Sequence, residues 1–80
     1  MTVITYHGRT AIIRPDNAIP LVVGWEYNIT PGEASMQWVR IVALTDKNVY
    51  TEGIDNTIAD WEIPIWKFDD LVKGYKEGPS

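Results

Sequence analysis

The side chains best placed to do chemistry in this sequence are carboxylates in its second half. Asp60 and Glu62 are two residues apart, so on a strand they share one face and could act as a paired general acid and base. Asp69 and Asp70 are adjacent, and adjacent side chains on a helix point about 100° apart, which suits a shared metal ion poorly. An exposed strand face and a stabilised helix start explain these carboxylates more simply than an active site.

Other residue types on which enzymes rely are scarce. The 80 residues include no Cys and one His, so neither a thiolate site nor a histidine cage for a metal is available. Ser35 and Ser80 lack a surrounding Gly-x-Ser-x-Gly turn, and the glycines are never clustered as in a phosphate-binding loop. We therefore predict a protein that is not an enzyme and that holds no metal or other cofactor.

The charge distribution favours a basic partner. The net charge is −4, and residues 46–70 alone carry −5 because seven acidic residues face two lysines there. Such a band repels phosphate backbones and attracts a basic protein surface, although it could also serve only to keep the protein in solution. Trp66 lies off the apolar stripe that follows it and would form an exposed anchor beside this acidic rim. The predicted partner-binding residues are Asp60, Glu62, Trp66, Asp69 and Asp70.

A second predicted interface lies on the segment 36–45, which is apolar on both faces. Trp38, Arg40 and Val42 alternate along it, so they share one face of a strand. That face is covered either by a terminal helix or by a partner, a second copy of the chain included. Aromatic and arginine side chains interleaved in this way also suit single-stranded nucleic acid. Three arginines in an acidic chain make nucleic acid the weakest of the partners considered.

The elements that would position these residues are mostly strands. Alternation and β-branched or aromatic content predict strands over 2–6, 10–14, 21–30, 36–45, 49–54 and 58–65. Turn signals separate them, among them His7-Gly8 and Asp46-Lys47-Asn48. Gly24 inside the third run predicts a bulge or a tight bend. Pro64 lacks an N–H and marks an edge position or the end of its strand.

The segment after Pro64 predicts a helix of about ten residues. Its apolar side chains recur at helical spacing, in the order Phe68, Leu71, Val72 and Tyr75. Asp69 and Asp70 would lie in its first turn, and two lysines in its last, as the helix dipole favours. A helix this short is marginal alone, so we expect its apolar stripe to dock on a sheet.

These elements predict one mainly β domain over residues 1–77, followed by a disordered tail at 78–80. The expected architecture is a small antiparallel SH3-like barrel, or a bent meander of five to six strands, with one short C-terminal α-helix. A flat α+β sheet covered on one face by the helix is the competing arrangement. The absence of Cys, of a signal region and of any apolar run near 20 residues predicts a cytoplasmic protein without a membrane segment.

One short string resembles a known group of proteins. The residues from Trp61 to Phe68, WEIPIWKF, followed by Leu71, resemble the ending of small SH3-like proteins encoded by bacteriophages and mobile elements. In those proteins a last strand runs into a Pro and a short Phe/Leu helix. Acidic, cysteine-free domains of this size are also similar in kind to phage inhibitors of host or defence proteins. The resemblance implies a protein-binding module that occludes a basic functional surface, with a structural subunit of a homo-oligomeric, virion-type assembly as the alternative.

Overall fold

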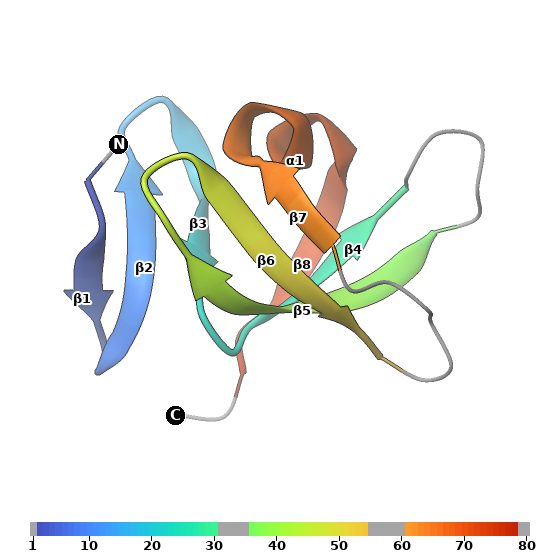
Figure 1. Cartoon of the computed structure of the whole chain (residues 1–80), viewed down its shortest axis with the longest axis horizontal. Coiled ribbons are helices and arrows are strands. Elements are labelled where there is room, and N and C mark those ends of the chain that lie inside the picture. Colours follow the sequence, from blue (N-terminus) through green and yellow to red (C-terminus); the bar gives the residue numbers. More distant parts are fainter. Residues whose placement is uncertain (1, 31–35, 55–60, 79–80) are drawn as a thin grey trace.

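The computed structural model describes residues 2–30, 36–54 and 61–78, which form eight strands and one helix (Figure 1). The mainly β prediction and the single short helix are confirmed. The strands are β1 (Ile4–Tyr6), β2 (Arg9–Arg14), β3 (Asn17–Val22), β4 (Glu26–Ile29), β5 (Gln37–Leu44), β6 (Asn48–Gly53), β7 (Trp61–Pro64) and β8 (Val72–Lys76), and α1 (Ile65–Leu71) joins the last two.

The first three strands form an antiparallel sheet in the order β1-β2-β3. The predicted hairpin between β1 and β2 is confirmed, and its turn residues His7 and Gly8 both have positive φ, +50° and +77°. Two consecutive residues with positive φ match the right-handed twist of the paired strands. Pro20 lies in β3, at the edge of this sheet, where a missing N–H costs no ladder hydrogen bond.

The other five strands form a second antiparallel sheet in the order β7-β6-β5-β4-β8. The predicted hairpin between β5 and β6 is confirmed, and Pro64 ends the edge strand β7 as expected. No closed barrel is found among the described strands, so the SH3-like barrel remains a prediction. The eight strands exceed the predicted five to six because one predicted strand is divided and one half of the predicted helix is a strand.

The divided strand is the segment 21–30, where Gly24 makes the predicted bend. Its φ is +94°, and the Cβ of any other residue would lie 2.2 Å from a guanidinium nitrogen of Arg9. The chain therefore leaves β3 after Val22 and enters β4 at Glu26, in the other sheet. The prediction of one continuous strand was wrong. The alternation of apolar and polar residues continues through the bend, but the residues before and after it belong to different sheets.

The predicted helix was wrong in its position. Helix α1 covers Ile65–Leu71, and the following residues pair with β4 as β8. Asp69 and Asp70 therefore lie in the second half of the helix, and Lys73 and Lys76 lie in a strand, so the predicted match to the helix dipole does not exist. Four residues of β8 have partners on β4, and Tyr75 stacks on the ring of Trp25 at 5.7 Å; together these contacts outweigh a weak local preference for helix.

The five-stranded sheet is strongly curved, because α1 connects its two edge strands directly. Seven helical residues extend about 10 Å, whereas edges four strand spacings apart in a flat sheet would be about 19 Å apart. The C-terminal end of β7 and the start of β8 are therefore drawn toward each other, with α1 between them (Figure 1). The flat α+β sheet is excluded for the described residues by this connection.

The core lies between the sheets and under α1. Tyr27 is fully buried there, and its ring meets Phe68 of the helix edge-on at 5.5 Å. Its hydroxyl donates to the carbonyl of Pro20 at 2.6 Å and accepts from the N–H of Val22 at 2.9 Å, so a β4 side chain binds the backbone of β3. The other fully or almost fully buried apolar residues are Ala11, Ile12, Leu21, Val22, Trp25, Ile29, Val39, Ile41, Val49, Ile63, Ile65 and Phe68.

The C-terminal end of the described chain lies beside the bend at Gly24. Gly78, which the sequence placed in a disordered tail, lies close to Gly24, since a Cβ on it would be 2.4 Å from the Gly24 carbonyl oxygen. Residues 79–80 lie outside the described residues, so the tail and the domain limit at 77 remain predictions. No helix in the described part of the chain has the length and apolar character needed to cross a membrane.

Candidate functional site

Trp66 is the most exposed large apolar side chain of the described residues, with 68% of its surface accessible. It lies on α1 between two anchors, Ile65 at 2% and Phe68 at 0% exposure, so the backbone that carries it is fixed by the core. The N–H of Ile65 also donates to the carbonyl of Lys47 at 2.9 Å, which ties the helix start to the β5–β6 turn. Trp66 lines a shallow hollow of about 400 Å³ together with Asp46, Lys47, Asn48, Pro64 and Ile65.

Asp69 is partly buried and is engaged in an ion pair within the protein. Its carboxylate forms an ion pair with Arg14, whose side chain is 7% exposed and also donates to the carbonyl of Ile19 at 3.0 Å. This ion pair joins β2 of the small sheet to α1. A carboxylate held in this way by a buried guanidinium is not available to a basic partner. Sequence reasoning could not foresee the pair, because its members are 55 residues apart.

Of the other predicted carboxylates, Asp70 shares a helix face with Trp66, whereas Glu62 lies on a different element. Asp70 is exposed on α1, four residues after Trp66 and therefore on the same face of the helix. Glu62 lies on β7 opposite Tyr50, and hydrogen bonding to its carboxylate raises the pKa of the Tyr50 hydroxyl. Asp60 lies outside the described residues, so the proposed acid–base pair with Glu62 cannot be placed.

The second predicted interface, with Trp38, Arg40 and Val42, lies on the outer face of β5. Arg40 donates to Glu52 at 2.8 Å and lies 3.6 Å from Glu26, its neighbours across β6 and β4. The hydrogen bond to Glu52 is the largest cause of a raised pKa for Arg40, so the guanidinium keeps its positive charge. Two carboxylates, those of Glu52 and Glu26, already balance that charge. That arrangement disfavours a phosphate backbone.

The aromatic residue of this second surface is also engaged. The amine of Lys76 lies 4.4 Å from the ring centroid of Trp38, a cation–π contact between β8 and β5. Val42 is 44% exposed beside an irregularity in the β5–β6 register, and it lines a hollow with Tyr50, Glu52 and Glu62. The structure thus brings Trp38, Arg40 and Val42 onto one face, but cross-strand contacts occupy the first two.

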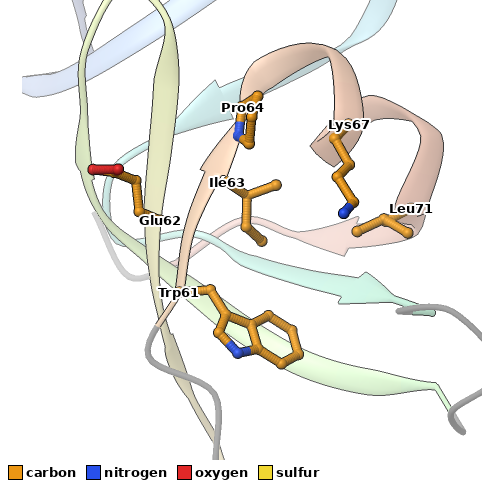
Figure 2. A pocket seen from close by; sticks show the side chains of 6 residues that line it. All are labelled: Trp61, Glu62, Ile63, Pro64, Lys67 and Leu71. Atoms are coloured by element: carbon orange, nitrogen blue, oxygen red, sulfur yellow. The ribbon is translucent and has the colours of Figure 1, made fainter.

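A groove that the sequence did not suggest runs along β7 beneath α1 (Figure 2). Its volume is about 270 Å³, and we call it the β7 groove; it is lined by Trp61, Glu62, Ile63, Pro64, Lys67 and Leu71. Figure 2 shows the side chains of Trp61, Ile63, Lys67 and Leu71 directed into a common space, with Glu62 pointing away on the other side of the strand. From the sequence, Pro64 predicted the edge position of this strand but no groove beside it.

Within the described ranges, no three His, Asp or Glu side chains lie close enough together to hold a metal ion. The single His7 is exposed in its hairpin turn and packs edge-on against Tyr6 at 4.3 Å.

Comparison of the chain with protein-family models, with curated proteins and with solved structures finds no match.

Proposed function

We propose that this protein acts by stoichiometric binding to another protein, without catalysing a reaction, and that Trp66 is the anchor of the contact. The observation that carries the proposal is an indole with 68% exposure on a helix whose neighbouring residues are buried. A large side chain on a fixed backbone loses little conformational freedom when a partner covers it, and Trp is enriched among the residues that dominate interface energies.

A basic surface is the partner that best suits the charges. The net charge is −4, and Asp70 is exposed on the same helix face as Trp66. Asp69 is not part of this contact, because Arg14 holds it. We propose that the protein is an inhibitor encoded by a phage or mobile element. It would act in the host cytoplasm by covering a functional basic surface of a host or defence protein.

The test compares wild type with Trp66→Ala as immobilised bait for proteins of the source cell, with quantitative mass spectrometry as the readout. Met36→Ala is a matched control, since Met36 is 63% exposed at the start of β5, in another part of the molecule. We expect a partner retained by wild type and Met36→Ala and lost with Trp66→Ala, and a one-to-one complex by calorimetry. A partner that binds all three baits equally would contradict the role of Trp66.

Self-association is the second candidate, because a second copy could cover the same indole. Light scattering over a concentration range distinguishes the two. An oligomer that Trp66→Ala converts to a monomer would favour an assembly subunit over an inhibitor, and a wild-type monomer would leave the partner-binding proposal in place.

A further inference from the structure

Among the described strands, β7 has one edge without a neighbour, and backbone groups at that edge are oriented to receive another strand. The N–H of Ile65 donates to the carbonyl of Lys47, in the same register that pairs Ile63 with Val49 and Trp61 with Thr51. Hydrogen bonds in an antiparallel ladder involve every second residue, so the N–H and carbonyl of Glu62 point away from β6. Among the described strands β7 pairs with β6 alone, so these groups face the open edge.

The side chains beside this edge are also incompletely covered. Trp61 and Leu71 are only partly buried, although both pack against the core, and together with Ile63 they form an apolar floor. The groove lies between β7 and α1, with Trp61 and Ile63 on the strand side and Lys67 and Leu71 on the helix side (Figure 2). An open edge next to an apolar hollow is the arrangement by which strand addition binds extended peptides.

The charges on the two faces of β7 differ, which restricts the kind of peptide. Lys67 is exposed and directs its amine into the groove, and no carboxylate in the described part of the chain lies within 4.0 Å of it. Glu62 projects from the opposite face of the strand. Side chains of an added strand alternate between the same two faces, and opposite charges across a strand pair stabilise it.

We propose that the β7 groove binds an extended peptide by strand addition, with an acidic side chain at Lys67, a basic side chain opposite Glu62 and an apolar side chain over Trp61 and Leu71. In an antiparallel peptide the order from the N-terminus is acidic, basic, apolar, because the residue opposite Ile63 lies nearest the start of α1 and the residue opposite Trp61 lies farthest from that start. The inference rests on the proposed function only in that the ligand is a polypeptide; its surface is separate from that of Trp66.

The experiment selects ligands for the purified full chain from a displayed library of random eight-residue peptides. Selected sequences are then synthesised with a fluorophore, and their affinity is measured by fluorescence polarisation. We expect enrichment of the acidic–basic–apolar order with β-branched residues around it. Lys67→Glu should weaken binding of such peptides by about fivefold, since repulsion replaces the attraction of an exposed pair. Selection repeated on Lys67→Glu should enrich a basic residue at the acidic position.

Two controls separate this inference from others. Trp66→Ala should bind the selected peptides with unchanged affinity, whatever its effect on a protein partner, so failure of the proposed function and failure of strand addition give different results. Asp70→Lys changes charge on the same helix away from the groove and should leave the peptide preference as it is. An absence of enriched peptides, or enrichment that does not respond to Lys67→Glu, would overturn the proposal.

Discussion

The hydroxyl of Tyr27 is the single polar group that we expect to contribute most to stability, and Tyr27→Phe removes it alone. It bonds the carbonyl of Pro20 and the N–H of Val22, both on β3, the edge strand of its sheet. The backbone groups of residues 20 and 22, two apart on a strand, point to the same edge of the sheet. The hydroxyl therefore bonds the groups that a neighbouring strand would otherwise bond. Val22 and Tyr27 are both fully buried, so water cannot replace the lost group.

The magnitude follows from what is left behind. A neutral hydrogen bond contributes about 1 kcal/mol net, and a buried polar group left without a partner costs about 1–3 kcal/mol. Tyr27→Phe leaves the buried N–H of Val22 without a partner and removes the hydrogen bond to the carbonyl of Pro20, a partly buried residue, while keeping the ring that packs on Phe68. We expect the free energy of unfolding to fall by about 2–4 kcal/mol, a large share of the roughly 4–12 kcal/mol available to an 80-residue domain.

Urea unfolding followed by Trp fluorescence measures this loss, with an unchanged denaturant slope showing that the compactness of both states is preserved. Tyr75→Phe is the matched control. It removes the same hydroxyl from the same aromatic cluster, where Tyr75 stacks 6.1 Å from Tyr27, but from a residue that is 41% exposed. We expect the control to change stability by less than about 0.5 kcal/mol. Equal effects of the two substitutions would refute the reasoning.

The same residue predicts a pH dependence. The pKa of the Tyr27 hydroxyl is raised well above its usual value near 10, and burial is the largest cause. In the unfolded chain the hydroxyl loses its proton near pH 10, whereas in the folded protein it keeps it, so the unfolded state binds fewer protons above that pH. Stability is therefore complete below pH 10 and falls at higher pH by up to about 1.4 kcal/mol per unit from this group. Tyr27→Phe should lack that component.

Two further substitutions test the structure with matched controls in the same unfolding assay. Asp69→Ala leaves the buried Arg14 without its ion-pair partner and should lower the free energy of unfolding by about 1–3 kcal/mol. The loss is smaller than for a fully buried pair because Asp69 is a quarter exposed. The control Asp70→Ala, at an exposed residue, should cost less than about 0.5 kcal/mol. Gly24→Ala should cost about 1–3 kcal/mol, because it forces an L side chain into a positive φ; the Arg9 guanidinium beside it is the end of a flexible side chain and adds little. At Gly74, where an added Cβ meets nothing within 4 Å, Ala should be neutral or stabilising. Equal losses within either pair would contradict the contacts assigned to it.

The features that could be predicted from the sequence are those set by neighbouring residues. The turn at His7-Gly8, the bend at Gly24 and the edge position of Pro64 each follow from the backbone chemistry of one or two residues, and all three are confirmed. The exposure of Trp66 could also be predicted, because Trp66 lies outside the apolar stripe of its segment. Local signals of this kind do not depend on which strands become neighbours.

The features that were missed depend on distant residues. The spacing of Phe68 and Leu71 suits α1, but Tyr75 meets the core equally well from a strand, and only pairing with β4 decides between helix and strand. The sequence predicted Asp69 as a partner-binding surface carboxylate. Its ion pair with Arg14 could not be predicted, because the two residues are 55 positions apart. The β7 groove depends on the curvature of a whole sheet and on where α1 crosses it, and no window of the sequence contains that information.

Helix α1 links the two proposed surfaces, and its length explains how they remain separate. Seven residues are too few to form a stable helix alone, so the position of α1 is set by its buried residues and not by its exposed ones. Trp66 and Lys67 are consecutive, and consecutive helical side chains diverge by about 100°, so one points toward the β5–β6 turn and the other into the β7 groove. A compact partner that covers the indole therefore has no need to enter the groove, and an added strand has no need to touch the indole. Substitution of either side chain should leave the helix in place and report on one surface at a time.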